Sequence, residues 1–397
     1  MGVMNTYMLN IRFGLSIVCL FFLCTHSNSQ FFQKDTISDS LDFDTLYSQS
    51  EESQDTVIVS VLLPFYIADN DTLVSKLIND NLDTNVIFNR SKLSLNLLTG
   101  VMLAVDSISS LGYPVKLHVF DTKRDVNRVR DIIWSDSLKS SNVIFGPLYS
   151  NTFNVLRSFL GTVYLNRNVK LLNPFSSNLQ ILESSNVYFL RPFNTIYIDT
   201  IISFLQKKKQ DILIVTFQKE GSPNIIRNRL LKDSIHVNLV NFNNLIEINK
   251  NSLDDLLIHE NMIIVLQDED KSFINRIVSF CSTLDKNISI LGSKSWINIP
   301  ELDVQILNSL NVHIPLVDYI DPNLNSNEIM LRNYERRFHS IMMESSYISF
   351  KSVLFFVMDN LGLESSLYNF STFNMSKGYV NTKINIYRYQ DFNLIKD

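Results

Sequence analysis

Glycine is scarce in this chain, with 10 residues among 397. Loops that hold phosphate groups through backbone N–H groups need closely spaced glycines, and the sequence contains no P-loop and no dinucleotide-binding fingerprint. It also lacks the G-x-S-x-G turn of serine hydrolases and the H-E-x-x-H helix of zinc peptidases. These absences argue against nucleotide chemistry and against the commonest hydrolytic mechanisms.

Histidine and cysteine are sparse as well. No two of the six histidines lie at metal-ligand spacing. Of the three cysteines, only Cys281 falls in the expected mature chain, within an apolar stretch that places it in the core. We therefore expect no disulfide, no metal, no cofactor and no catalytic residues, and a fold stabilised by its hydrophobic core. The histidines are His26, His118, His236, His259, His313 and His339.

Basic charge is not in excess. The formal net charge is -5 at pH 7, whereas proteins that bind nucleic acid or anionic membranes usually present a basic field. Both classes of partner are therefore not expected. The hydrophobic content of 45% is typical of a globular protein with a substantial core.

The N-terminal residues have the features of a cleavable export signal. Arg12 precedes the apolar run Phe13–Leu23, which is long enough for a signal-peptide core and too short to span a bilayer. Small residues at Ser27 and Ser29 predict cleavage before Gln30. Residues 1–29 are thus expected to be removed and the mature chain to reside in the periplasm, without a transmembrane segment.

Lipidation at Cys19 or Cys24 is the alternative fate of this N-terminus. Lipoprotein signals usually place a small residue before the cysteine, but Val18 and Leu23 occupy those positions. An outer-membrane lipoprotein is therefore the less favoured prediction. Residues 30–56, rich in acidic and small polar side chains, predict a disordered linker.

From residue 57 onward, apolar runs alternate with amphipathic segments. Val57–Leu63 is almost continuously apolar, as expected of a strand buried on both faces of a sheet. Such strands alternating with helical patterns predict a parallel sheet flanked by helices. Further strands are expected at 115–120, 143–145, 169–172, 211–216, 235–240, 262–266, 288–291, 312–317 and 384–389, and helices at 94–111, 124–138, 152–165 and 327–361.

Two such α/β units are predicted, joined near residues 188–194. We assign 57–193 and about 319–368 to lobe 1, and 194–318 and about 369–397 to lobe 2. The stretch between Tyr66 and Arg90 lacks a clear periodic pattern, and we expect a loop there.

Polar and aromatic residues follow three strands of the first lobe. Ligands of open α/β sheets bind beyond the carboxyl ends of the strands, where helix N-termini expose backbone N–H groups. The serines can instead serve only as helix caps and turn residues, and the tyrosine after the third strand can serve only in packing. The candidate ligand contacts are Tyr66, Tyr149, Ser150, Phe175, Ser176 and Ser177.

Six segments in order resemble the type I periplasmic binding proteins, the family of the branched-chain amino acid (Leu-Ile-Val) receptors. They are VIVSVLLPF, LLTGVMLAVDSI, KLHVFDTKRD, NVIFGPLYSN, LLNPFSSN and VYFLRPFNT. The resemblance covers residues 57–218 well, and the ending GYVNTKINIYRYQDFNL is similar to a Bacteroidota subgroup that often carries LysM peptidoglycan-binding modules. It implies an α/β, two-lobed fold in which each lobe is a parallel sheet flanked by helices.

The resemblance also implies site residues. Ser150, Phe175 and Ser177 fall where family members contact the carboxylate and ammonium of the ligand, and Glu220 falls in the turn after the first strand of the second lobe. Phe175 stands where the family has a small residue, and the turn at Glu220 lacks the family's aromatic residue.

Two functions follow from these features. The first is a non-catalytic, exported solute-binding protein that takes up an amino acid or peptide-like ligand in a cleft between its lobes. The second is an envelope scaffold or regulator of cell-wall synthesis with a degenerate cleft, acting through protein or peptidoglycan contacts. The lobe 1 turns favour the first, and Phe175 favours the second.

Overall fold

The computed structural model describes residues 56–80, 82, 86–163, 168–218, 222–249, 261–266, 270–374 and 376–397. The predicted export signal, nearly all of the predicted linker, and Glu220 lie outside these residues. The chain divides into two compact units. Unit 1 comprises Met1–Arg191 and Pro322–Asn381, and unit 2 comprises Pro192–Asp321 and Thr382–Asp397.

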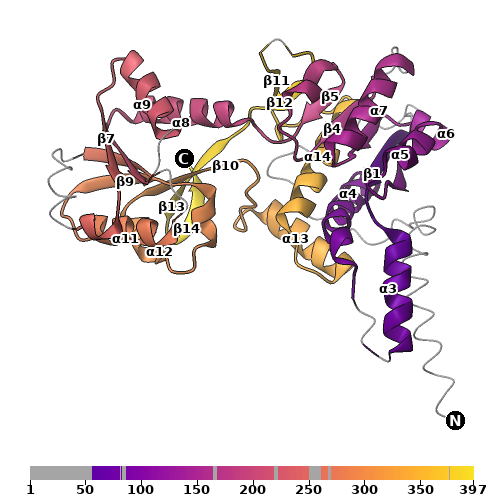
Figure 1. Ribbon diagram of the computed structural model, residues 1–397, viewed down its shortest axis with the longest axis horizontal. Coiled ribbons are helices and arrows are strands. Elements are labelled where there is room, and N and C mark those ends of the chain that lie inside the picture. The colour runs from indigo at the N-terminus through magenta and orange to yellow at the C-terminus, as the bar shows by residue number, and fades with distance from the viewer. Residues whose placement is uncertain are drawn as a thin grey trace. The chain divides into compact units, whose positions relative to one another are not determined.

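Unit 1 is built on a seven-stranded sheet in the order β11-β12-β5-β4-β3-β1-β2 (Figure 1). All neighbouring pairs from β12 to β2 are parallel, and only the edge strand β11 runs antiparallel to its neighbour. The predicted α/β sheet is therefore confirmed, with one antiparallel edge. Its strands are β1 (Val57–Leu63), β2 (Val115–Asp121), β3 (Val143–Phe145), β4 (Lys170–Asn173), β5 (Val187–Phe189), β11 (Phe370–Thr372) and β12 (Tyr379–Asn381).

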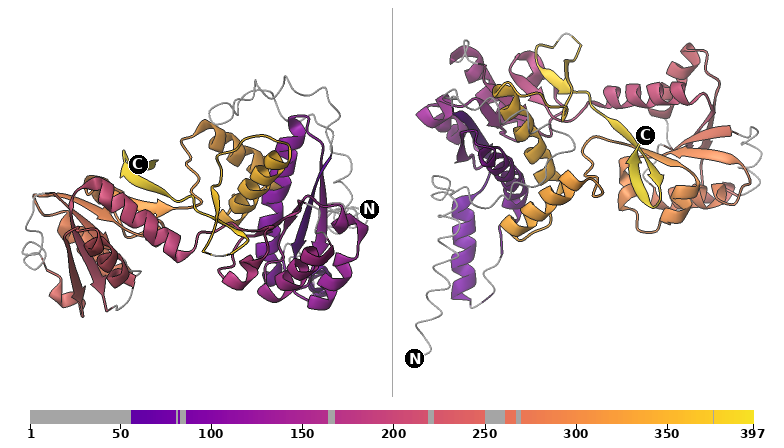
Figure 2. Two further views of the ribbon diagram at one scale, coloured as in Figure 1. Left: turned by 90° about the horizontal axis from the view of Figure 1, so that it is seen from above. Right: turned by 180° about the vertical axis from the view of Figure 1, so that it is seen from behind.

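Helices cover both faces of this sheet (Figure 2). On one face α4 packs along α14, and a side-chain carbon at Gly100 would overlap the backbone of Ser346, so this close approach requires glycine. The segment Asn89–Ser110, which includes α4, is long and apolar enough to cross a bilayer, yet half of its apolar window is buried inside the unit, as in a core helix. The helices are α3 (Ile67–Asn79), α4 (Lys92–Ser110), α5 (Val126–Ile133), α6 (Asp136–Lys139), α7 (Ser150–Val163), α13 (Asn325–Phe338) and α14 (Glu344–Asn360), with 3-10 turns η3 (Asn89–Ser91) and η4 (Leu179–Glu183).

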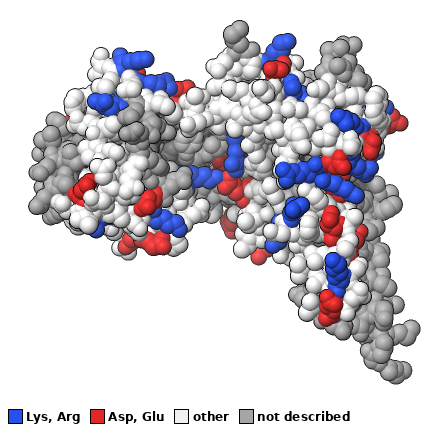
Figure 3. All heavy atoms as spheres, in the orientation of Figure 1, with Lys and Arg blue, Asp and Glu red and all other residues white. Residues whose placement is uncertain are grey.

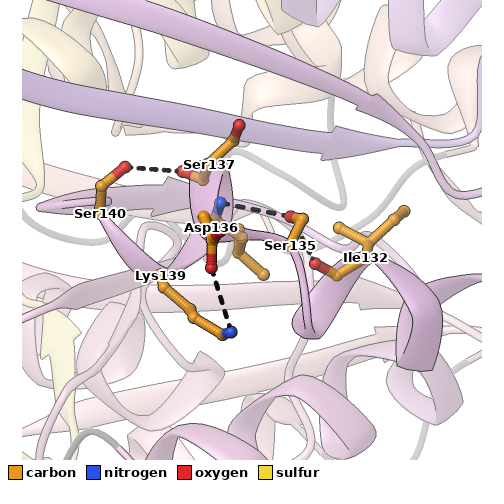
Figure 4. A network of polar contacts seen from close by, with 7 residues as sticks. Ile132, Ser135, Asp136, Ser137, Lys139 and Ser140 are labelled. Atoms are coloured by element: carbon orange, nitrogen blue, oxygen red, sulfur yellow. Dashed lines mark hydrogen bonds and ion pairs between the residues drawn. The ribbon is translucent and has the colours of Figure 1, made fainter.

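Residues 124–138, expected as one helix, form two. The hydroxyl of Ser135 donates to the carbonyl of Ile132 over 2.7 Å and accepts the backbone N–H of Leu138 at 3.3 Å, which closes α5 and caps α6 (Figure 4). An ion pair of 3.3 Å between Lys139 and Asp136 spans the short helix α6. The serine cap explains why the helix breaks where apolar periodicity alone predicts continuation.

The prediction of a loop between Tyr66 and Arg90 was wrong for the first half of this stretch, because Ile67–Asn79 forms the helix α3. The side chain of Asn70 ties the base of this helix to unit 1: its Nδ2 donates to the carbonyls of Phe65 and Tyr66, both over 3.0 Å. Its Oδ1 accepts the N–H of Phe88 at 2.9 Å. Beyond this base α3 extends away from the rest of unit 1 and buries none of its side chains (Figure 1).

Residues 369–381, expected in the second lobe, belong to unit 1 instead. β12 pairs in parallel with β5, and β11 pairs with β12. Asn381 is fully buried, and its amide Nδ2 donates to the carbonyl of Leu190 over 3.0 Å. These strands are only three residues long and partly polar, so no sequence pattern indicates which sheet they extend.

Unit 2 contains a second seven-stranded sheet, in the order β14-β13-β10-β9-β8-β6-β7. The strands from β10 to β7 are parallel, and β13 and β14 add an antiparallel edge. One face packs on α8 and α9, and the other on α11 and α12 (Figure 1). The strands are β6 (Asp211–Phe217), β7 (Val237–Phe242), β8 (Asn261–Leu266), β9 (Asn287–Leu291), β10 (Val312–Leu316), β13 (Asn385–Gln390) and β14 (Asn393–Lys396). The helices are α8 (Asn194–Lys208), α9 (Ser222–Lys232), α11 (Lys271–Cys281) and α12 (Val304–Ser309), with 3-10 turns η5 (Leu245–Glu247) and η6 (Lys294–Asn298).

Cys281 lies in the core of unit 2, as expected. Its thiol is free and buried, and burial raises its pKa to about 12, so the reactive thiolate is disfavoured at physiological pH. It packs with Trp296, one of the two tryptophans of the chain, in the layer between the sheet and α11 and α12.

Candidate ligand-binding site

The six predicted contact residues that the structure describes all follow strands of unit 1. Tyr66 follows β1, Tyr149 and Ser150 follow β3, and the segment 175–177 follows β4. Because these strands are parallel neighbours, their carboxyl ends lie at the same edge of the sheet. We call the loops at this edge, residues 64–66, 122–125, 146–150, 174–178 and 190–191, the strand-end surface.

Asp121 organises the first part of the strand-end surface. Its carboxylate accepts four backbone N–H groups, from Phe65 at 2.9 Å, Tyr66 at 3.2 Å, Ile67 at 3.1 Å and Lys123 at 2.9 Å. The side chain is buried, so these bonds form away from bulk water. The same carboxylate therefore fixes two loops and caps the N-terminus of α3.

Three residues other than glycine adopt left-handed backbone conformations in these two loops. They are Tyr66, Lys123 and Arg124, with φ values of 52°, 49° and 57°. Such a conformation costs about 1 kcal/mol or more for a residue with a Cβ atom, and it persists where surrounding contacts enforce it. Asp121 holds Tyr66 and Lys123 through their N–H groups, and the hydroxyl of Thr122 accepts the N–H of Arg124 at 3.5 Å.

Arg124 lies over the ring of Tyr149. Its guanidinium carbon is 4.0 Å from the ring centroid, which is a close cation–π contact. Burial raises the pKa of Tyr66, and the neighbouring Tyr149 adds to the rise while Arg124 opposes it, so Tyr66 remains protonated near neutral pH. The cluster thus presents one permanent cation beside two phenol groups.

Ser150 does not cap α7, contrary to one expectation. The carbonyl of Tyr149 accepts the first helical N–H, from Phe153 at 2.8 Å, and the side chain of Asn151 accepts the N–H of Thr152 at 2.9 Å. Ser150 is exposed in the first turn, and its hydroxyl forms no hydrogen bond within the described part of the chain. It can therefore donate to a ligand beside Tyr149.

The turn after β4 depends mainly on Asn173. This fully buried side chain accepts the N–H groups of Phe175 at 3.1 Å and Ser176 at 2.7 Å through its Oδ1. The hydroxyl of Ser176 accepts the N–H of Asn178 at 3.1 Å, which is the turn role predicted as the alternative to a ligand contact. Ser177 is exposed.

Phe175 contacts a second arginine. The guanidinium carbon of Arg191 is 5.0 Å from the centroid of its ring, and Nη2 of Arg191 lies 3.0 Å from Oε1 of Glu344. Phe175 also packs on the core of unit 1, so it is only half exposed. The phenylalanine that stands where the family has a small residue therefore serves as the platform for an arginine–carboxylate pair.

Our sequence reading did not identify Arg124, Arg191 or Glu344. Arg124 begins the predicted helix 124–138 and Arg191 lies in the predicted junction 188–194, so neither stood at the end of a predicted strand. Glu344 is 153 residues from Arg191 in the sequence, and no local pattern relates them. Within the described residues, no group of three or more His, Cys, Asp or Glu side chains could hold a metal ion.

Figure 3 shows the charged side chains on one face of unit 1. Basic and acidic side chains are interspersed over the visible face of unit 1 rather than gathered into a field of one sign (Figure 3).

No family model matches the sequence, and no curated protein matches it. Solved structures do match. A branched-chain amino acid ABC transporter protein from Rhodospirillum rubrum has a TM-score of 0.57 at 10% identity, covering 86% of this chain and 100% of its own. A branched-chain amino acid ABC transporter periplasmic ligand-binding protein from Burkholderia xenovorans has a TM-score of 0.51 at 12% identity, covering 86% and 94%.

Full-length LpoA from Haemophilus influenzae is also similar, with a TM-score of 0.53 at 12% identity over 87% of this chain and 60% of that chain. These likenesses show the fold. The chain has the two-lobed α/β fold of the type I periplasmic binding proteins, as the resemblance of its sequence segments implied.

Proposed function

We propose that this protein is an exported, non-catalytic binding protein of the periplasm. Its ligand is a small polar molecule with a carboxylate, such as an amino acid or a short peptide, and the strand-end surface of unit 1 is its binding surface. The observation that carries the proposal is the Arg124–Tyr149 stack, held in place by the loops that Asp121 organises. The predicted N-terminal export signal and the fold support the periplasmic location.

The geometry suits a carboxylate. A guanidinium stacked on a ring keeps its N–H groups in the plane, where they can donate two parallel hydrogen bonds to a carboxylate. Arg124 is exposed, so these donors face solvent. The free hydroxyl of Ser150 lies in the residue after Tyr149 and adds a neutral donor. Tyr66 and Tyr149 supply the apolar surface and hydroxyl groups that orient small ligands.

Arg124→Ala is expected to weaken ligand binding about 10- to 100-fold, because a bidentate, charge-assisted contact contributes about 1.5–3 kcal/mol. Tyr149→Phe should retain most of the affinity, since it keeps the ring under the guanidinium. Isothermal titration with amino acids and dipeptides measures both effects. Arg130→Ala, an exposed arginine of α5, is the matched control. Equal affinity of the Arg124 and Arg130 variants would contradict the proposal.

A second function, an envelope scaffold acting through protein contacts, is favoured by α3. This 13-residue helix buries none of its side chains, and helices of that length are marginal in water without a packing partner. Exposed apolar side chains continue from its end into the following segment. They are Ile78, Leu82, Val86, Ile87 and Leu93. Such a concentration of exposed apolar residues is typical of a protein-binding surface.

A photo-cross-linking side chain at Ile78 is expected to form a discrete adduct in cells if the scaffold function holds. The same probe at Ile225 on α9, an isoleucine of similar exposure, should give none. Leu77→Glu placed beside the Ile78 probe should abolish the adduct, because a charge on the apolar side of α3 opposes docking. Identical adducts from positions 78 and 225 would refute this second function.

A further inference from the structure

Arg191 is held in place by its backbone neighbours. The N–H of Leu190 donates to the carbonyl of Asn173 over 3.1 Å, and the carbonyl of Leu190 accepts Nδ2 of Asn381 at 3.0 Å. All three residues are fully buried. The chain therefore leaves β5 in a direction fixed by β4 and β12, and Arg191 emerges at the strand-end surface beside the turn that carries Phe175.

The side chain of Arg191 already holds a carboxylate. Its guanidinium stacks over Phe175 and pairs with Glu344, in the same arrangement of ring, cation and anion that a bound acid would adopt. Both members of the pair remain about two-fifths exposed, at 44% and 41% for their side chains. Ion pairs with this exposure stabilise a fold very little, so a competing carboxylate can replace Glu344.

Glu344 has a second source of stabilisation. It lies in the first turn of α14, and the residue before the helix, Met343, forms no side-chain cap. The partial positive charge of a helix N-terminus favours a carboxylate at this position without any help from arginine. Release of Arg191 therefore costs Glu344 little, and the pair can open without disturbing α14.

We propose that Arg191 is a carboxylate-binding residue of the strand-end surface and that Glu344 is an internal carboxylate occupying it until a ligand acid takes its place. This inference rests on the proposed function. It adds Arg191 and Glu344 to the binding surface, with Glu344 competing with the ligand's carboxylate for Arg191. It also gives Phe175 a role: the ring orients the guanidinium rather than blocking a small ligand. The ligand class is a free carboxylic acid, and amides or esters of the same compound are disfavoured.

Competition makes the two substitutions act in opposite directions. Glu344→Gln removes the internal anion while keeping the size of the side chain, and is expected to raise affinity for free acids about fivefold. Arg191→Gln removes the guanidinium that binds the carboxylate and should abolish the preference for an acid over its amide. Glu328→Gln on α13, an exposed glutamate that pairs with Arg332 at 3.3 Å, is the matched control and should change neither quantity.

The probes are dipeptides and N-acetyl amino acids, each compared with its C-terminal amide by isothermal titration against the whole purified chain. Opposite shifts in the Glu344 and Arg191 variants would support the competition. If the unaltered chain binds the acids but both variants bind them with unchanged affinity, the inference is overturned and the proposed function stands. If neither the unaltered chain nor the Glu344 variant binds any probe, both are overturned. Thermal unfolding of each variant verifies that it is folded.

Discussion

Asp121→Ala is expected to lower the free energy of unfolding by about 3 kcal/mol. The substitution leaves four backbone N–H groups without their acceptor, and each buried donor left unsatisfied costs about 1–3 kcal/mol, although water entering the space recovers part of the sum. It also releases the left-handed conformations of Tyr66, Lys123 and Arg124, which partly offsets the loss. Urea unfolding followed by circular dichroism measures the change.

Asp125 provides the comparison for this prediction. It caps α5 by accepting the N–H of Asn127 at 2.7 Å, and it is exposed, so Asp125→Ala should cost only about 1 kcal/mol. Asp121→Asn is a finer test, because its amide would face the N–H of Ile67 where Oδ2 now accepts. We expect its loss in free energy of unfolding to lie between those of the two alanine variants. A loss at Asp121 no larger than that at Asp125 would show that the four bonds do not organise these loops.

Acidification from pH 6.5 to pH 4 is expected to destabilise the chain by about 2–3 kcal/mol through His313 alone. Burial lowers the pKa of this imidazole from 6.5 to about 4, with the charges of Lys208 and Arg388 acting in the same direction and Asp397 opposing them. The unfolded chain therefore binds a proton below pH 6.5 that the folded chain does not. This stabilisation is fully present above pH 6.5 and is lost as the pH falls through 4.

His313→Gln should remove this part of the pH dependence, whatever its effect on stability at neutral pH. His236→Gln, at an exposed histidine, should leave the dependence intact. Trp296 and His313 are both buried in unit 2. The fluorescence of Trp296 in a Trp134→Phe background therefore follows the unfolding of unit 2 in urea. Parallel pH profiles of the unaltered chain and the His313 variant between pH 4 and 6.5 would be inconsistent with a neutral buried imidazole.

The sheets were predictable because burial on both faces leaves a strong pattern. Val57–Leu63 reads as a continuous apolar run, and it became β1 over the same residues. Its neighbours follow the alternation of strand and helix, which leaves few arrangements other than parallel pairing. The core face of α4, from Leu97 to Ile108, was visible for the same reason, since it repeats at helical spacing.

Short or unburied elements could not be predicted in this way. α3 buries no side chain and carries only a short apolar pattern, Leu73, Val74, Leu77 and Ile78. Its N-terminal cap comes from Asp121, which is distant in sequence. The strands β11 and β12 are three residues each, and their place beside β5 depends on contacts such as that of Asn381 with Leu190.

The candidate site was predictable in its location and only partly in its chemistry. The loops after β3 and β4 were identified, but Ser176 and Asn173 serve as turn and backbone partners. The charged groups came from elsewhere: Arg124 is placed by a left-handed backbone, and Glu344 reaches Arg191 only through the packing of α14 in unit 1. Neither relation follows from local sequence.

Thermal unfolding of the purified chain in the presence of free amino acids and dipeptides tests the strand-end surface most directly. A ligand at 100 times its dissociation constant adds about 2.7 kcal/mol to the free energy of unfolding. We predict that at least one free acid stabilises the chain in this way and that the corresponding amide does not. The stabilisation by the acid should be smaller in the Arg124→Ala variant. An unfolding temperature that no compound changes, or one that Arg124→Ala leaves equally responsive, would contradict a carboxylate-binding surface at the ends of these strands.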